Sequence, residues 1–278
     1  MAGNPLNEGQ GERVKLTIGQ LRARQLRLLR AVADHCETHG LRYYLCAGTL
    51  LGAVRHGGYI PWDDDIDLML PRPDFDALCA SFPTSAAPDQ VSLRALSNSP
   101  THVLPFAKVC DDQTRLEVES DIIKGLGVFI DVFPLDGWSD RQALRIVQRV
   151  SLRLLPQVMR IMHVVRKRRR TMLRNLLIAV GKVVLSGLRP RWVAMTMEKV
   201  ARLGNFDSCS YGGVIVWGYQ ESVPVKAYGT PGELIFEDRS YNVPQDCDTV
   251  LQSLYGDYML LPPEEARVTN HRFVAYER

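Results

Sequence analysis

The feature that most constrains this chain is a run of carboxylates that leads directly into an apolar stretch. Four of the five residues 63–67 are aspartates, and the apolar residues 68–70 follow them. Aspartate is a poor strand former, and neighbouring carboxylates repel one another unless cations neutralise them. Because side chains at i and i+2 of a strand share a face, Asp63, Asp65 and Asp67 should point together. The pattern predicts a strand that holds Mg²⁺; a solvated acidic turn is the alternative.

A glycine-containing turn precedes the aspartates and supports their interpretation as metal ligands. A short apolar run, Tyr43–Ala47, predicts a buried strand, and Gly48 and Thr49 end it before a helix begins. The free N–H groups at the start of a helix bind phosphate. A strand-to-helix turn with glycine is also common structure, but beside an acidic strand it predicts a phosphate-binding turn that faces a metal site. Arg55 and His56 follow, and either strengthen phosphate binding or lie on the surface.

Hydrophobic patterning predicts alternating helices and strands in the first half of the chain. Thr17 can cap a first helix that Gly40 ends. From about Tyr211, frequent Gly, Tyr and Pro residues indicate strands and turns. The fold class that fits best is mixed α/β, with α+β character and a mixed sheet. We expect helices at 17–40, 50–56, 73–81 and 247–255, strands at 43–47, 66–70, 103–109 and 128–133, and a surface connection at 84–100.

Charge is distributed unevenly along the chain. Residues 141–197 contain 14 Lys or Arg and no Asp or Glu, so the net charge of +3 combines a segment of +14 with a remainder of −11. Arg141, Arg145, Arg149 and Arg153 recur every four residues, which puts them on one helix face. Such asymmetry is typical of a surface that meets phosphate, in nucleic acid or in anionic lipid.

Other features limit where the protein works. The six cysteines are far apart and form no CxxC motif, so reduced thiols are expected rather than a zinc site or a disulfide framework. No apolar run opens the sequence, so no signal peptide is visible. The longest apolar stretch, 176–188, carries Lys182 and is shorter than the roughly 20 residues that a spanning helix needs. We expect a cytoplasmic protein.

Several blocks of the sequence resemble the LicD family. This family belongs to the nucleotidyltransferase-fold superfamily and includes the fukutin-related transferases. The resemblance covers roughly residues 20–140 and 205–275 and leaves the basic middle unmatched. The longest match is ungapped and dense, and shorter blocks follow it. The blocks are Gly48–His56, Gly58–Asp67, Ala107–Val109, Ile130–Gly137, Leu254–Met259, Leu261–Pro263 and His271.

The resemblance implies a nucleotidyltransferase-like core and a metal-dependent phosphotransferase. Such enzymes typically move phosphocholine from CDP-choline to a sugar hydroxyl of a cell-surface glycan, such as lipopolysaccharide, teichoic acid or capsule. In the superfamily, two strand carboxylates hold Mg²⁺ (or Mn²⁺) and a third completes the site. These map onto Asp65, Asp67 and, as the best third candidate, Asp131, which is otherwise a strand-end residue. Asp63 could be an outer ligand, and Asp136 is better interpreted as a turn residue.

Further residues are candidates for substrate binding. We expect the Gly48 and Thr49 turn to hold phosphate oxygens, together with Lys108. The alternative for Lys108, which lies in an apolar run, is that its amine reaches the surface. Trp62 and Tyr59 could stack on a base or on choline, although packing around the loop is the simpler role for either one.

The expected mechanism leaves the protein little covalent work. An acceptor hydroxyl attacks the distal phosphorus in line and CMP leaves, while Asp65 and Asp67 hold the metal. Asp131 either binds the metal or takes the hydroxyl proton. His271 and Arg272 could approach the site from the C-terminal part of the chain.

The basic segment 141–197 has three interpretations. It binds the anionic inner face of a membrane as a peripheral element, it binds nucleic acid, or it is a solvated insertion. Nucleic acid suits the run Arg166–Arg170 but is disfavoured, because no stacking aromatic residues interleave with that run and no nucleic-acid motif is present. Rival functions are a transferase of CDP-ribitol or CDP-glycerol, a nucleotidyltransferase and a non-catalytic basic adaptor. The expected parts are a flexible tail at 1–16, a catalytic core at 17–140, a basic helical insertion at 141–204 and the rest of the catalytic domain at 205–278.

Overall fold

The structure, a computed structural model, describes residues 14–84, 90–118, 125–163, 181–183, 185–216, 221–269 and 273–278. Helices and strands alternate in the first half of the chain, and the sheet mixes parallel and antiparallel pairs, which confirms the α/β class. The helices are α1 (Ile18–His39), α2 (Ala47–His56), α3 (Arg72–Ser81), α4 (Gln142–His163), α6 (Pro190–Ala201) and α7 (Cys247–Tyr255). The strands are β1 (Tyr44–Leu45), β2 (Asp67–Pro71), β3 (Val91–Arg94), β4 (Ala107–Asp111), β5 (Thr114–Val118), β6 (Phe129–Trp138), β7 (Tyr211–Gly213), β8 (Val223–Pro224), β9 (Gly232–Phe236), β10 (Arg239–Val243) and β11 (Phe273–Glu277).

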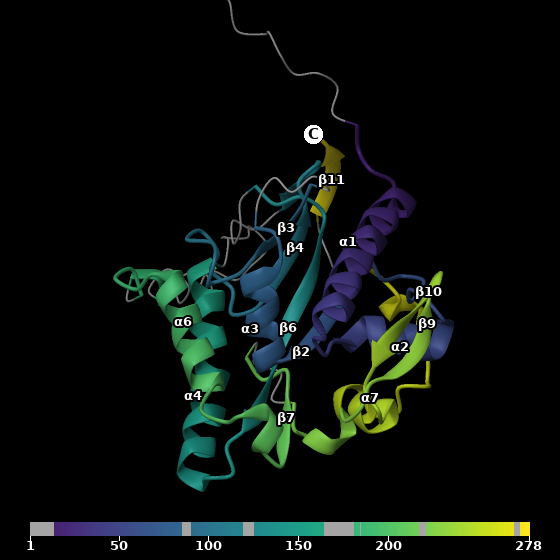
Figure 1. The fold of residues 1–278 in the computed structure, drawn as a ribbon. Helices are drawn as coiled ribbons and strands as arrows, with labels where there is room; N and C mark the ends of the chain where they lie inside the picture. Colours follow the sequence, from purple (N-terminus) through teal and green to yellow (C-terminus); the bar gives the residue numbers. More distant parts are fainter. Residues whose placement is uncertain are drawn as a thin grey trace, which may run out of the picture.

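The central sheet has the strand order β1-β2-β6-β4-β3. β2 and β6 run parallel, whereas the β1–β2, β6–β4 and β4–β3 pairs are antiparallel. The second half of β6 pairs with β7, which in turn pairs with β8. β6 runs through the middle of the molecule, as Figure 1 shows. The parallel register sets Asp67 opposite Asp131, so two of the predicted metal ligands lie on neighbouring strands.

The first helix forms for local reasons that its sequence indicates. The Thr17 hydroxyl accepts a hydrogen bond from the Gln20 N–H at 3.3 Å, and the Gln20 side chain accepts one from the Thr17 N–H at 2.8 Å, which completes a capping box. Gly40 ends the helix in the left-handed conformation, with φ 65°. One face of α1 is buried, mostly in the main core, with Leu21 in a smaller separate cluster. Its residues are Leu21, Gln25, Leu28, Leu29, Val32, Ala33 and Cys36.

Two sequence expectations about the sheet are wrong. The expected surface connection 84–100 contains β3. Asp136, expected in a turn, lies inside β6, where it is fully buried and accepts hydrogen bonds from Arg72 Nε at 2.8 Å and Nη2 at 2.5 Å. The strand expected at 128–133 stops before Pro134, whereas β6 continues through it. β4, however, begins opposite Val132, so on that side Pro134 has no neighbouring strand to which an N–H would have to donate.

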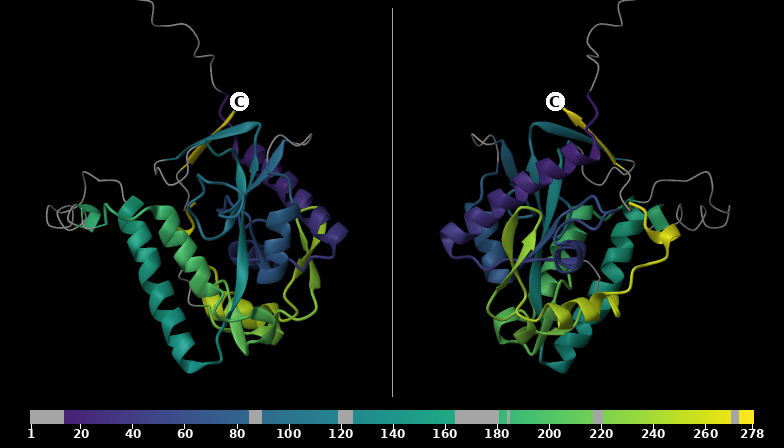
Figure 2. Two further views of the ribbon diagram at one scale, coloured as in Figure 1. Left: turned by 60° about the vertical axis from the view of Figure 1, so that its left-hand side comes forward. Right: turned by 90° about the vertical axis from the view of Figure 1, so that its right-hand side faces the viewer.

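α4 and α6 form a pair of helices beside the sheet (Figures 1 and 2). α6 is held to the connection before β4 by Arg191, whose guanidinium donates to three backbone carbonyls at 2.6 to 2.9 Å. A second apolar cluster joins both helices to the end of β6 at Trp138. The cluster contains Leu96, Trp138, Leu152, Met159, Val193, Ala194, Met197, Ala201, Ile215 and Val216.

The predicted helix of the basic segment is present as α4, which carries Arg145, Arg149 and Arg153 at four-residue intervals. The apolar stretch 176–188 lies partly outside the described residues. Among the residues that the structure describes, no helix combines the length and the apolar character that a membrane span requires. All six cysteines are free thiols, as expected. The predicted limits of the parts at 1–16, 17–140, 141–204 and 205–278 stay predictions.

Candidate active site

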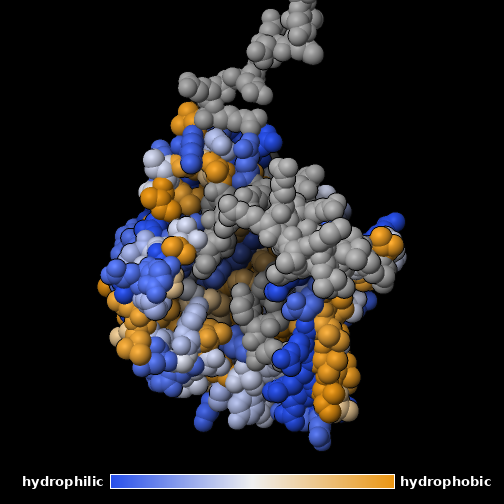
Figure 3. Space-filling view, turned by 180° about the vertical axis from the view of Figure 1, so that it is seen from behind, coloured by the Kyte–Doolittle hydropathy of each residue, from blue (hydrophilic) through white to orange (hydrophobic). Residues whose placement is uncertain are grey.

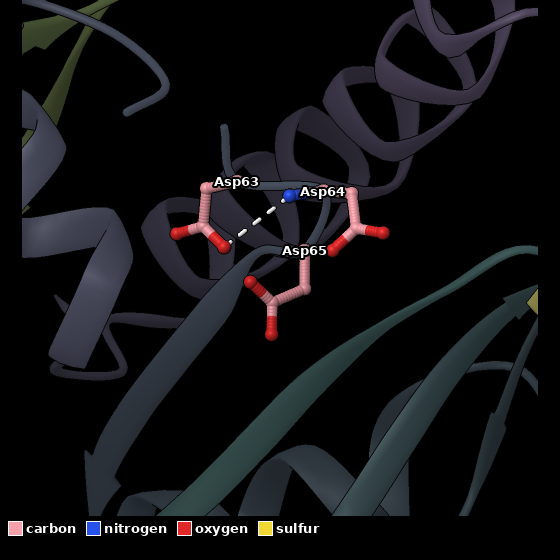
Figure 4. Close-up of side chains that lie close together, drawn as sticks. All are labelled: Asp63, Asp64 and Asp65. Atoms are coloured by element: carbon pink, nitrogen blue, oxygen red, sulfur yellow. Dashed lines mark hydrogen bonds between the residues drawn. The ribbon is translucent and has the colours of Figure 1, made fainter. Parts of the chain in front are cut away.

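Three consecutive aspartates gather where the chain enters β2 (Figure 4). Asp63, Asp64 and Asp65 each offer a carboxylate oxygen, and these oxygens lie within 4.8 Å of one another. Helix α1 holds this segment by its backbone, because Arg22 donates to the Asp63 carbonyl at 2.6 Å and Gln25 donates to the Asp64 carbonyl at 2.8 Å. The sequence predicted Asp63 and Asp65 inside a strand. They precede it, since β2 begins only at Asp67.

A cavity of about 390 Å³ lies beside these aspartates. Asp63, Asp65 and Asp67 line it and Asp64 does not, so the three carboxylates predicted to share a face do border one space. Gly48, in the first turn of α2, is also part of the lining. The rest of the lining is mainly apolar and includes one further carboxylate. It consists of Cys46, Ala47, Phe133, Val214, Glu221, Leu254 and Tyr255.

The third predicted ligand, Asp131, is joined to the predicted phosphate-binding lysine. Antiparallel pairing of β4 with β6 sets Lys108 opposite Asp131, and Lys108 Nζ lies 2.5 Å from Asp131 Oδ1. The Lys108 amine also lies 3.5 Å from the centre of the Phe129 ring, and the residue is only 6% exposed. Its amine therefore neutralises and orients Asp131 and does not reach the surface. The expected contact of Lys108 with phosphate stays a prediction.

The carboxylates crowd one another around Asp67. Burial raises the pKa of Asp67 well above its ordinary value, and the nearby carboxylates of Asp65, Asp131 and Asp63 raise it further, whereas Lys108 opposes the shift. Lys108 thus opposes the mutual repulsion of these carboxylates. Closely spaced carboxylate oxygens around one space are the ligands that Mg²⁺ and Mn²⁺ prefer. The donor set therefore fits a divalent cation, which would relieve the repulsion.

The start of α2 borders the same cavity. The first backbone hydrogen bond of the helix runs from Leu50 N to Cys46 O at 3.0 Å, so the N–H groups of residues 47–49 precede the helical ladder. Gly48 permits a close approach, because a Cβ there would lie 2.7 Å from Asp63 Oδ2. The Thr49 hydroxyl accepts a hydrogen bond from the Asp67 N–H at 2.9 Å and so ties α2 to β2. The arrangement can bind a phosphate between a helix start and the carboxylates.

Four other candidates do not line the cavity. Arg55 and His56 lie at the opposite end of α2, where Arg55 donates to the Tyr258 carbonyl at 2.9 Å. The Trp62 ring lies under the Arg267 guanidinium at 5.6 Å, and the Tyr59 hydroxyl, buried in the core, bonds to Gln25 at 3.1 Å. The substrate-binding roles expected of these residues stay predictions. His271 and Arg272 lie outside the described residues.

Glu221 is the lining residue that sequence reasoning missed. Its carboxylate accepts hydrogen bonds from the Val214 N–H at 2.8 Å and the Tyr228 hydroxyl at 2.9 Å. Burial raises the pKa of Glu221, and these two hydrogen bonds only partly oppose the shift. No motif or spacing marks this glutamate in the sequence. Tyr255, another lining residue, did lie in a block that resembled the LicD family.

The family model described as LicD/FKTN/FKRP, nucleotidyltransferase domain, matches residues 40–134. The matched segment contains the aspartate cluster, the start of α2, Lys108 and Asp131, which are the parts that form the site. Residues 40–134 thus match the LicD family model, and the resemblance seen in the sequence is confirmed.

One relative extends the likeness beyond that segment, and others share a short stretch. The lipopolysaccharide cholinephosphotransferase LicD of Haemophilus influenzae is 27% identical over 271 residues, which cover 94% of this chain and 98% of the relative. The ribitol 5-phosphate transferase FKRP of Homo sapiens is 53% identical over 47 residues, which cover 16% of this chain and 10% of the relative. An uncharacterised Rickettsia prowazekii protein is 40% identical over 47 residues. The family relatives with a stated activity are phosphotransferases.

Proposed function

We propose that this protein transfers phosphocholine from CDP-choline to a sugar hydroxyl of a cell-surface glycan, with a divalent cation in the aspartate cluster. The observation that carries the proposal is the cavity in which Asp63, Asp65 and Asp67 meet the first turn of α2. This combination suits a diphosphate, because metal ligands and helix N–H groups act on the same phosphate oxygens. The likeness to a lipopolysaccharide cholinephosphotransferase along nearly the whole chain supports the same reaction.

The metal would be held by Asp65 and Asp67, with Asp131 beside Asp67 in the sheet register. When bound, a divalent cation would offset the negative charge of the diphosphate and of the leaving CMP. The Asp131 carboxylate is already ion-paired with the Lys108 ammonium, which holds it in place beside Asp67. We therefore assign Asp131 to the ligand set rather than to proton transfer.

The other groups of the cavity position the donor for the reaction. The N–H groups at Ala47 and Gly48 hold phosphate oxygens, and the apolar part of the cavity restricts water around the reacting phosphorus. The acceptor oxygen bonds to the distal phosphorus, the bond from that phosphorus to the bridging oxygen breaks, and CMP carries the electron pair away. The hydroxyl proton passes to a cavity carboxylate or to water.

The cavity also favours a cationic donor over a neutral polyol. Glu221 is buried beside a lining that includes Phe133 and Tyr255, and within the described part of the chain it forms no ion pair. An aromatic lining with one carboxylate suits the quaternary ammonium of choline. Ribitol and glycerol carry no charge and need several hydrogen-bonding partners. We therefore favour CDP-choline over CDP-ribitol or CDP-glycerol.

The test replaces one carboxylate at a time with its neutral isostere. Asp65→Asn or Asp67→Asn should reduce CMP release from CDP-choline at least 100-fold in the presence of Mg²⁺ and an acceptor glycan, because the metal loses a charged ligand. The melting temperature should not fall, since removal of one crowded carboxylate relieves repulsion.

The matched control is Asp238→Asn, which changes an exposed aspartate paired with Arg30 and should leave turnover unchanged. Normal CMP release in either site variant would refute the metal site. Release of phosphocholine in place of CMP would instead indicate nucleotidyl transfer.

A further inference from the structure

Helix α4 is apolar on two sides, and only one of them is covered. Leu152 and Met159 are buried in the cluster shared with α6. On another side, Ile146, Val150 and Leu154 are 55%, 52% and 59% exposed. Their four-residue spacing aligns them along the helix. We call these three residues the outer stripe; it is an unpartnered apolar face within the described part of the chain.

A row of arginines runs beside the outer stripe. Arg145, Arg149 and Arg153 each precede one stripe residue, so the row is turned by about 100° around the helix from the stripe. Figure 3 shows a hydrophobic column alongside a hydrophilic one over α4. The Arg149 guanidinium also lies 5.3 Å from the Trp138 ring, which ties the row to the end of β6.

We propose that the outer stripe and its arginine row dock α4 onto an anionic lipid surface. An apolar face flanked by basic residues is the form in which helices lie in a membrane interface, with the apolar side chains in the headgroup boundary and the cations near lipid phosphates. No Asp or Glu in residues 141–197 opposes this contact. Docking of α4 on lipid would determine where the protein works, and it does not depend on the proposed reaction.

Two other occupants of this face, a second copy of the chain and nucleic acid, are disfavoured. A second copy packed stripe to stripe would bring two arginine rows together, and residues 141–197 offer no acid to pair with them. Nucleic acid would use the arginines but would leave the apolar stripe in water. A lipid surface satisfies both halves of the face.

The experiment is co-sedimentation of the full chain with sucrose-loaded vesicles. The wild-type protein should pellet with phosphatidylcholine vesicles that contain phosphatidylglycerol, and not with pure phosphatidylcholine, and the bound fraction should fall as salt rises. The double variant Val150→Glu/Leu154→Glu should bind at least tenfold more weakly. The matched control Ile235→Glu changes a residue that is 60% exposed on β9 and should bind like the wild type.

The arginines are tested in the same way. Arg145→Glu/Arg153→Glu should lose binding to anionic vesicles, whereas Arg115→Glu, at an exposed site on β5, should retain it. Unchanged melting temperatures show that the variants fold. Wild-type protein that stays in the supernatant with anionic vesicles at low salt overturns the proposal. So does a dimer, measured by light scattering, that Val150→Glu/Leu154→Glu converts to monomers.

Discussion

The buried carboxylate of Glu221 makes one part of the cavity chemically different from the part that the aspartates border. Asp63, Asp65 and Asp67 border the part suited to metal and diphosphate, whereas Glu221 lies among apolar and aromatic residues. Its two hydrogen bonds come from neutral donors, the Val214 N–H and the Tyr228 hydroxyl. A cation placed beside Glu221 would therefore complete its charge balance, and the proposed choline headgroup is such a cation.

At the residue scale, Glu221→Gln should change which donor the enzyme prefers. The amide keeps the size and hydrogen-bonding ability of the side chain but removes the charge, so the KM for CDP-choline should rise about tenfold, equivalent to about 1.4 kcal/mol of lost binding. Turnover with CDP-glycerol should stay at the wild-type level. Steady-state CMP release with each donor measures the preference for CDP-choline over CDP-glycerol. An unchanged preference would refute the headgroup assignment and leave the metal site untouched.

The sequence predicts residues of the site where a short local pattern carries the information. The alternation at Asp63, Asp65 and Asp67 needs no tertiary structure, and the cavity lining agrees with it. Glu221 could not be predicted in this way, because the residues that bury and orient it belong to separate elements. The pairing of Lys108 with Asp131 depends on the β4–β6 register, which a sequence pattern does not specify.

Elements are predicted best where their ends have their own signals. Thr17 was expected to cap the start of α1 and Gly40 to end the helix, and the structure confirms both positions. The strand was predicted to stop at residue 133, whereas β6 continues through Pro134. A proline breaks a strand only where its missing N–H is needed, and that depends here on where β4 begins. The limits of a strand thus follow from its neighbours, which lie far away in the sequence.

At the element scale, two glycines of α2 should respond differently to alanine. A Cβ at Gly48 would lie 2.7 Å from Asp63 Oδ2, the movable end of a side chain, whereas one at Gly52 would lie 2.4 Å from the Gly58 carbonyl oxygen, which is backbone. Gly48→Ala should change unfolding free energy by less than about 1 kcal/mol and still reduce CMP release at least tenfold, because Asp63 moves. Gly52→Ala should cost about 2 kcal/mol through overpacking.

Urea unfolding and CMP release, measured on both glycine variants, separate the two effects. Full activity in Gly48→Ala would show that neither Asp63 nor the close approach of α2 matters to the reaction. Wild-type stability in Gly52→Ala would show that the turn between α2 and the aspartates can shift freely.

At the scale of the whole molecule, stability should depend on one buried histidine. His102 is 1% exposed, its Nε2 bonds to the Phe106 carbonyl at 2.7 Å, and its Nδ1 has no partner among the described residues. Burial lowers the pKa of His102 from 6.5 to about 4, and the charges of Lys108 and Arg191 add to this shift. A proton added at Nδ1 would therefore be buried without an acceptor.

The unfolded chain binds this proton below about pH 6.5, and the folded chain only near pH 4. The stability that neutral His102 contributes is thus present above pH 6.5 and is lost as the pH falls toward 4, by up to about 3 kcal/mol. His102→Gln, neutral throughout and still able to donate to the Phe106 carbonyl, should lack this slope. Urea unfolding at pH 7, 5.5 and 4 measures it, and equal slopes in both proteins would contradict the assignment.

The central strand β6 connects the two working surfaces of the molecule. It carries Asp131 opposite Asp67, which lines the cavity, and ends at Trp138, in the cluster that supports α4. The seven residue steps from Asp131 to Trp138 span roughly 23 Å of extended chain. With α4 on a lipid surface, the packing of α4 against the end of β6 would hold the reacting phosphorus at a nearly constant height above the bilayer. The acceptor would then be selected by how far its sugar hydroxyl stands from its lipid anchor, as well as by which sugar carries it.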